Sequence, residues 1–283
     1  MSKIKLFDLH SDLPTSSLKN KLSLAKQNVE NGNLCINAVY RGKLKSDKAF
    51  ALARDFFNQG CLLAFEDCCY QDFFIDAEKN INCDKVRALV IKLSTFSPLY
   101  LSLGWNYENC FCGGCASSAP LTAHGEIFIE QSNACNIAVD LAHTNEKSFY
   151  QILNKANKVL CSHTAFQWVY PHRRNLDKNQ VRAVLDKGGI IGVIAVGHFL
   201  SGIKSNNKNY KNAYFEHIKS YLKNFGVNGL CIGSDFYGSD APVYADGDYG
   251  FVQEVHDFFK NIGFSHQDCE KVLYKNAVNF FNF

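Results

Sequence analysis

The chain has 283 residues, with 30 Lys or Arg against 27 Asp or Glu, so its formal net charge is +3. This small excess excludes a broadly basic nucleic-acid-binding protein, and the 47% hydrophobic content excludes a disordered chain. No apolar run approaches the roughly 18 residues of a membrane-spanning helix, and no signal peptide forms before His10. We therefore expect a cytoplasmic protein that binds neither nucleic acid nor membranes.

Eight short runs rich in β-formers alternate with longer helical patterns, which is typical of βα units with a parallel sheet. Helical patterns cover residues 46–60, 84–93, 121–136, 145–157, 179–189, 210–226, 251–263 and 267–281, and we expect Ser46 to be an N-cap and Gly60 to end the first of them. The connection over residues 16–31 gives no clear prediction. The predicted strands are residues 4–10, 34–40, 61–66, 99–105, 137–143, 158–163, 190–196 and 229–236.

Eight such units in about 250 residues predict a (β/α)8 TIM barrel. The strands read as nearly continuous apolar runs, as expected for a sheet that is covered on both faces. No linker, low-complexity tract or repeat divides the sequence, so we expect residues 1–283 to form a single domain. An open doubly wound sheet is the alternative, and the positions of the polar residues argue against it.

Potential metal ligands follow most of the predicted strands. In a barrel the C-terminal ends of the strands share one face, where barrel enzymes place their active sites. A strand-end His is usually a satisfied polar group and a strand-end Asp is usually a helix cap, but six together favour a metal site. Imidazoles and carboxylates without thiolates suit zinc, and this number suits two ions. The residues are His10, Asp12, Glu66, His143, His163 and Asp235.

The motifs FDLHSDLP, FEDCC, WNYEN, LTAHG, VDLAH, CSHTAF, HRRNL and GSDFYG occur in one order along residues 7–238. In order and spacing this set resembles the renal (membrane) dipeptidase family of zinc metallopeptidases. The resemblance implies a (β/α)8 barrel that hydrolyses L,L dipeptides, with L,D dipeptides as a further class, by means of a hydroxide bridging two zinc ions. It also implies a hydrolase whose partner is a small dipeptide, and family members often form homodimers.

Carried over position by position, the resemblance assigns roles to individual residues. It implies that His10, Asp12 and Glu66 bind one Zn²⁺, and that Glu66 bridges to a second Zn²⁺ held by His143 and His163. It places Asp235 as the catalytic acid and base. Arg174 would bind the terminal carboxylate of the substrate, which limits the enzyme to short peptides; the alternative for Arg174 is a surface salt bridge.

Two positions depart from the family pattern. Trp105, followed by Asn106, replaces a His that contacts the carbonyl oxygen, and this change resembles bacterial-type members with Trp-Asn. We expect Trp105 and Asn106 to line the substrate site. Tyr237 replaces the second acidic residue of the DFDG motif and is expected to orient its loop. A catalytically impaired family member is therefore one alternative. The other is an amidohydrolase acting on a cyclic amide, lactone or acyl-amino acid; a substrate of this kind that has no carboxylate would gain nothing from Arg174.

Twelve cysteines are present, and none is needed by the inferred zinc centre. In a reducing compartment most are expected to pack as small hydrophobic side chains. Five follow the third and fourth strands, so a soft-metal site or a redox-sensitive disulfide is a further hypothesis; they are Cys68, Cys69, Cys110, Cys112 and Cys115.

Overall fold

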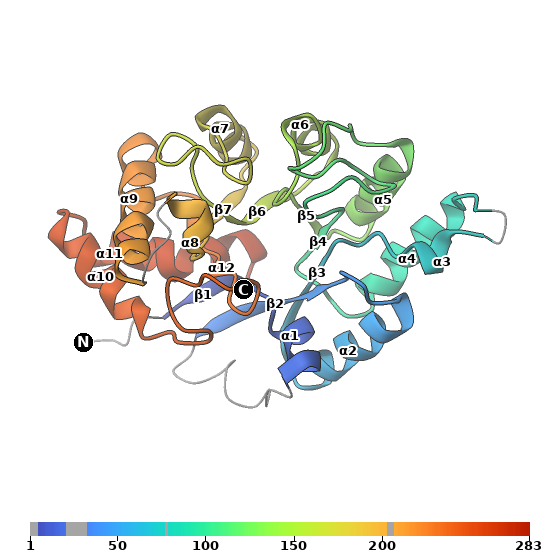
Figure 1. Ribbon diagram of the computed structural model, residues 1–283, viewed down its shortest axis with the longest axis horizontal. Coiled ribbons are helices and arrows are strands. Elements are labelled where there is room, and N and C mark those ends of the chain that lie inside the picture. The colour runs from blue at the N-terminus through green and yellow to red at the C-terminus, as the bar shows by residue number, and fades with distance from the viewer. Residues whose placement is uncertain (1–4, 21–32, 77–78, 203–206) are drawn as a thin grey trace. The chain divides into compact units, whose positions relative to one another are not determined.

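The computed structural model describes residues 5–20, 33–76, 79–202 and 207–283. All eight predicted strands form, and several of them are labelled in Figure 1. They run parallel in the order β1 to β8 as a closed barrel. This confirms the predicted (β/α)8 barrel. The strands are β1 (Phe7–Ser11), β2 (Leu34–Tyr40), β3 (Leu62–Glu66), β4 (Tyr100–Ser102), β5 (Ala138–Asp140), β6 (Val159–Thr164), β7 (Ile190–Val193) and β8 (Leu230–Ile232).

Helices follow the strands as the periodicity predicts, and the structure adds the short helices α3 and α8. The connection after β1 begins with α1 (Leu13–Asn20), and residues 21–32 of it lie outside the described residues. The others are α2 (Ser46–Asn58), α3 (Gln71–Phe74), α4 (Cys83–Ser94), α5 (Ala123–Ala134), α6 (Glu146–Lys155), α7 (Lys178–Asp186), α8 (Gly197–Leu200), α9 (Asn207–Phe225), α10 (Phe251–Asn261), α11 (His266–Glu270), a π-helical turn (Lys271–Lys275) and α12 (Asn276–Phe281).

Residue contacts divide the chain into two compact units. The first unit comprises Met1–Ile36 and Cys161–Phe283, and the second unit comprises Asn37–Leu160. The boundaries fall within β2 and β6, so each unit contains part of both strands. The single domain over residues 1–283 stays a prediction, and the two units are described one at a time below.

Side-chain caps mark where α5 and α6 of the second unit begin. Thr122 and Asn145 accept hydrogen bonds from the backbone N–H groups three residues on, at the starts of α5 and α6. The prediction that Ser46 caps α2 is wrong, because the N-cap is Lys45 and Ser46 is the first helical residue, whose hydroxyl donates to Asp72. Gly60 follows α2 with a φ of 74°, as a helix-ending glycine does.

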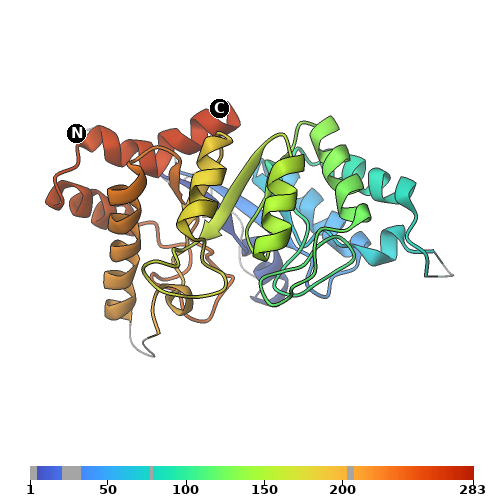
Figure 2. The same ribbon diagram turned by 90° about the horizontal axis from the view of Figure 1, so that it is seen from above.

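Apolar faces of the helices pack against the strands within each unit. In the second unit α4 contacts α5, and α5 contacts α6 (Figure 2). In the first unit α9 contacts α8, and the π-helical turn contacts both β1 and β8. Within the described part of the chain, no helix has the length and apolar character needed to cross a membrane.

Candidate active site

His10 and Asp12 of the first unit lie at the C-terminal end of β1. The His10 side chain is fully buried, and its Nε2 is 3.6 Å from Asp12 Oδ1. The Asp12 backbone N–H donates to the carbonyl oxygen of Phe236 at 2.8 Å, which joins this end of β1 to the chain that follows β8. The His-x-Asp pair therefore presents an imidazole and a carboxylate from one rigid segment, as the spacing on a strand predicts.

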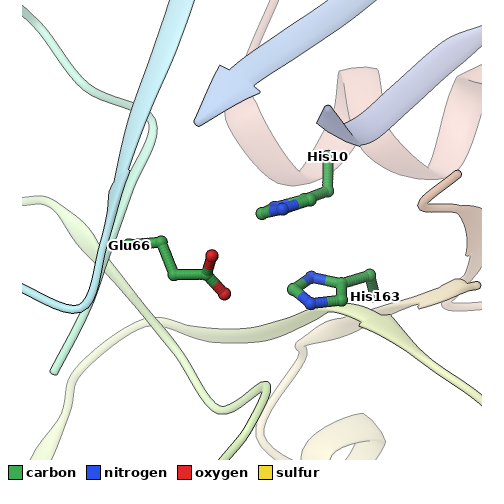
Figure 3. Close-up of side chains that lie close together, drawn as sticks. All are labelled: His10, Glu66 and His163. Atoms are coloured by element: carbon green, nitrogen blue, oxygen red, sulfur yellow. The ribbon is translucent and has the colours of Figure 1, made fainter. Parts of the chain in front are cut away.

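His163 and Asp235 lie beside His10 in the same unit. The ring centroids of His10 and His163 are 4.0 Å apart, and the two rings face each other (Figure 3). Asp235 Oδ1 is 3.8 Å from His10 Nε2, and the Asp235 backbone N–H donates to the carbonyl oxygen of His10. Ligand atoms of His10, Asp12 and Asp235 all lie within 4.8 Å of one another, which is a geometry that can hold a metal ion.

The electrostatics of this group favour a bound cation. Burial and the nearby Asp12 carboxylate raise the pKa of Asp235 to about 7, although His10 and Arg174 lower it. The Asp12 Oδ1 atom is buried and accepts no hydrogen bond from any described residue. Two neighbouring carboxylates with an unused oxygen beside imidazole rings fit a divalent metal ion, because a cation would neutralise the charge that burial opposes.

Arg174 is buried in the loop after β6, with 5% of its surface exposed. Its Nη2 donates to the carbonyl oxygen of His163 at 3.3 Å, and its own carbonyl oxygen accepts from the Thr164 hydroxyl. The guanidinium carbon lies 5.6 Å from the ring centroid of Phe199. Nε is buried and donates to no described residue, and no described carboxylate forms an ion pair with Arg174. This burial excludes the alternative of a surface salt bridge.

Glu66 and His143 form a second pair of candidate ligands, in the second unit. Glu66, labelled in Figure 3, is the last residue of β3, and His143 follows β5. His143 Nε2 lies 3.1 Å from Glu66 Oε1, and at most 8% of either side chain is exposed. His143 has a φ of 68°, and its carbonyl oxygen accepts from the Cys115 N–H.

Asn106 fixes the orientation of the His143 ring. Its side-chain oxygen lies 2.9 Å from His143 Nδ1 and also accepts from the Cys115 thiol at 3.2 Å. Because that oxygen can only accept, Nδ1 donates its proton to it, and Nε2 is the ring nitrogen that faces Glu66 and could bind a metal ion. This is how a second residue prepares a histidine for metal binding. The sequence predicted Asn106 as a substrate-binding residue, and that role stays a prediction.

Trp105 lies between two other rings of the second unit. Its ring centroid is 5.3 Å from that of Tyr40 and 5.8 Å from that of His143. Trp105 thus adjoins a candidate metal ligand, and its place in the substrate site stays a prediction.

The hypothesis of a soft-metal site or a redox-sensitive disulfide now concerns one pair of cysteines, Cys69 and Cys110. Cys69 Sγ and Cys110 Sγ lie 2.6 Å apart in the second unit, whereas the Cys68 thiol donates to the carbonyl oxygen of Phe65. Among the described residues, the side-chain groups whose geometry could hold a metal ion contain no cysteine. The structure therefore supports a redox-sensitive pair rather than a soft-metal site.

Three residues shape the site of the first unit although none of them was among the predicted site residues. Asp8 accepts hydrogen bonds from Ser234, the residue before Asp235. Gly238 passes so close to Asp235 and Asp12 that a Cβ atom there would collide with both carboxylates. For Gly238 the available signal in the sequence was the final glycine of the GSDFYG motif. Tyr237, at a φ of 66°, donates its N–H to Asp246, so its backbone helps to fix this loop as expected.

A closed barrel of eight parallel strands, with histidines and carboxylates at the strand ends, defines the class of barrel-type metal-dependent hydrolases. Within this class the chain belongs to the membrane dipeptidase family (peptidase family M19), whose family profile matches residues 84–282. This confirms the resemblance on which the residue assignments were based.

Individual relatives agree with this family. The chain is 29% identical over 182 residues to an uncharacterised protein of the pqqA 5′ region of Klebsiella pneumoniae, covering 61% of this chain and 67% of that protein. It is 24% identical over 184 residues to dipeptidase tcpJ of Claviceps purpurea, covering 63% of this chain. The match spans only 43% of the length of tcpJ.

Solved structures share the fold over nearly the whole chain. The M19 metallopeptidase named dipeptidase AC superposes with a TM-score of 0.78 at 17% identity, covering 99% of this chain and 98% of the other. A metallopeptidase from Rhodobacter sphaeroides, bound to a phosphinate mimic of the dipeptide L-Ala-D-Ala, superposes with a TM-score of 0.76 at 16% identity. The match covers 99% of each chain.

Proposed function

We propose that this protein is a dipeptidase that uses two zinc ions to hydrolyse L,L and L,D dipeptides. The observation that carries the proposal is the close approach of the candidate ligands His10 and Asp12 to the acid-base candidate Asp235, in the same unit as the buried Arg174, whose Nε has no described acceptor. Family membership supports the reaction class. The L,D class is supported by the relative from Rhodobacter sphaeroides that binds the L-Ala-D-Ala mimic.

The proposed zinc ligands are the five residues that the family resemblance assigns. His10, Asp12 and Glu66 would hold one ion, and Glu66 would bridge to a second ion that His143 and His163 hold. The barrel order supports this assignment, because the C-terminal ends of all strands share one face in a closed barrel. Zinc bound there would supply Lewis acidity, which polarises the peptide carbonyl and activates water.

Asp235 would move the proton in this reaction. Its carboxylate accepts a proton from the attacking water and then donates that proton to the nitrogen of the leaving amine, as general base and then general acid. The contact between its backbone N–H and the carbonyl oxygen of His10 keeps the carboxylate beside the first candidate ligands. The collision that a Cβ at residue 238 would cause explains why the loop has glycine there.

Arg174 would select dipeptides through their C-terminal carboxylate. A guanidinium presents planar, paired donors that match a carboxylate, and burial strengthens the interaction because water is excluded. Nε is available for this purpose within the described structure. In a tripeptide the carboxylate would lie one residue further from the scissile bond, so longer peptides would lose this contact.

Metal analysis combined with hydrolysis of a dipeptide panel tests the proposal. The wild-type protein is expected to bind two zinc ions and to hydrolyse L-Ala-L-Ala and L-Ala-D-Ala. Asp235→Asn should retain both ions and lose at least about a hundredfold in kcat, the size of a general acid-base contribution. A protein that binds two zinc ions but hydrolyses no dipeptide would refute the proposal.

Arg174→Met distinguishes a dipeptidase from an amidohydrolase with uncharged substrates. This variant should lower kcat/KM for L-Ala-L-Ala by about 10-fold to 100-fold, because a charge-assisted pair is lost. Arg173→Met is the matched control, since Arg173 is exposed and precedes the buried arginine. Equal activity of Arg174→Met and the wild type, with turnover of a lactone or cyclic amide, would favour the amidohydrolase.

A further inference from the structure

A small cavity of about 230 Å³ lies entirely within the second unit. Its walls come from the loops that follow β2, β3 and β4, at the end of the strands where barrel enzymes bind substrate. Cavities for drug-sized ligands measure about 300–1,000 Å³, so this one suits a single side chain. The lining residues are Tyr40, Arg41, Gly42, Lys43, Asp67, Trp105, Tyr107, Glu108 and Asn109.

Three aromatic side chains line this cavity. Tyr40 and Trp105 pack against each other with a ring separation of 5.3 Å and an angle of 44° between their planes. Tyr107 is 67% exposed, so much of its side-chain surface is available to a bound group. A ring bound in the cavity would cover part of Tyr107 and pair with the other aromatic residues, since such pairs form at centroid separations of about 4.5–7 Å.

The charges that line the cavity are paired within it. Arg41 Nε donates to the Asp67 carboxylate at 2.9 Å, and Nη2 donates to the same oxygen. The Asn109 amide donates to the other Asp67 oxygen at 3.1 Å, so this carboxylate is fully used. Lys43 and Glu108 add one exposed charge of each sign. The cavity therefore has no net charge with which to select an acidic or basic side chain.

The cavity adjoins the candidate metal ligands of its own unit. Asp67 directly follows Glu66, and Trp105 lies 5.8 Å from the His143 ring. Asn106, which orients His143, stands between two lining residues in the sequence. A side chain in the cavity would thus belong to a substrate whose reacting bond is near these ligands.

We propose that this cavity binds the side chain of the N-terminal residue of the dipeptide and that it prefers an aromatic one. The inference rests on the proposed dipeptidase function. The C-terminal side chain is attached to the carbon that bears the carboxylate, so it stays near Arg174, in the loop after β6. The N-terminal side chain lies on the other side of the scissile bond, and we assign it to the cavity because the cavity adjoins Glu66 and His143 and its lining contains no residue of the Arg174 loop.

The preference is tested with the zinc-loaded protein and three substrates, Phe-Ala, Ala-Phe and Ala-Ala. The wild type should give kcat/KM at least about tenfold higher for Phe-Ala than for Ala-Ala, which corresponds to burial of one phenyl ring. Ala-Phe should have no comparable advantage. In Tyr107→Ala the ratio of Phe-Ala to Ala-Ala should fall by about fivefold, since one aromatic pair is lost, and Tyr107→Phe should restore it.

Ile91→Ala serves as the control, because Ile91 is exposed on α4 and does not line the cavity. It should leave the ratio unchanged. Equal rates for Phe-Ala and Ala-Ala, or a preference for Ala-Phe over Phe-Ala, would overturn the inference while leaving the dipeptidase function intact. Loss of all three activities with two zinc ions bound would instead overturn the proposed function, and the inference with it.

Discussion

The Asp8 carboxylate accepts two hydrogen bonds from Ser234, one from the backbone N–H at 2.8 Å and one from the hydroxyl at 2.5 Å. It also accepts from the His10 backbone N–H at 3.3 Å. Asp8 is fully buried on β1, and Ser234 directly precedes Asp235. One structural carboxylate therefore joins the two strand ends that carry the donor group of the first unit.

Asp8→Ala should lower the free energy of unfolding by about 3 kcal/mol, because buried N–H and O–H groups lose their acceptor. Urea unfolding monitored by circular dichroism measures this change. Asp257→Ala is the control, since its carboxylate is 59% exposed on α10, and it should change the stability by less than about 0.5 kcal/mol. Equal stability of the two variants would contradict the joining role of Asp8.

A buried histidine outside the candidate active site should make stability depend on pH. His217 Nδ1 accepts from the Phe166 N–H, so the ring is neutral, with its proton at Nε2 facing the Leu200 carbonyl oxygen. Burial lowers the pKa of His217 from 6.5 to about 4. Between these pH values the unfolded chain binds more protons than the folded chain, so stability falls as pH drops from 6.5 to 4.

This difference in the pKa of His217 corresponds to a loss of about 3 kcal/mol in the free energy of unfolding as the pH falls from 6.5 to 4. Unfolding free energies measured at pH 7 and pH 4.5 should differ less in His217→Gln than in the wild type. His266→Gln, at an exposed position of α11, is the matched control and should behave like the wild type. A pH dependence that is identical in all three proteins would show that His217 does not contribute.

The contact between Asn106 and His143 predicts an effect on metal affinity that does not depend on turnover. Asn106→Ala removes the acceptor at His143 Nδ1, so the ring is no longer held in one tautomer and orientation. Zinc affinity should fall by about 10-fold to 100-fold, measured by competition with a chelator. Asn133→Ala is the control, because within the described structure that side chain bonds to Lys155 and Asn157. Unchanged affinity in Asn106→Ala would refute the orienting role.

Cys69 and Cys110 should form a disulfide under mild oxidation. Their sulfur atoms are 2.6 Å apart, and hydrogen bonding from Cys110 lowers the pKa of Cys69, which favours the reactive thiolate. Hydrogen peroxide would accept two electrons and two protons from the pair, giving one S–S bond and two waters. Peptide mapping after alkylation should find this link in the wild type and in Cys83→Ser, and not in Cys69→Ser. Any other pairing as the main product would contradict the prediction.

The fold could be predicted from the sequence because its signals are local. Each strand is a short apolar run between polar residues, and β2 has the predicted bounds Leu34–Tyr40. The sequence-based predictions are wrong at some ends of helices and strands, because tertiary contacts determine where these elements begin and end. Ser46 was expected to cap α2, but its backbone N–H and hydroxyl both donate to Asp72, which is 26 residues away.

The sequence by itself determined the order of the βα units, the family resemblance and the candidate ligands, since each depends on residue types at fixed positions along the chain. Only the tertiary structure decided which partners those residues have. Asn106 meets His143 across 37 residues, and Asp8 meets Ser234 across 226 residues. Such pairs have no periodic signal, because the barrel strands, and not the intervening sequence, determine which side chains become neighbours. The small net charge likewise gave no sign that Arg41 pairs with the buried Asp67 carboxylate, because only packing brings these two residues together.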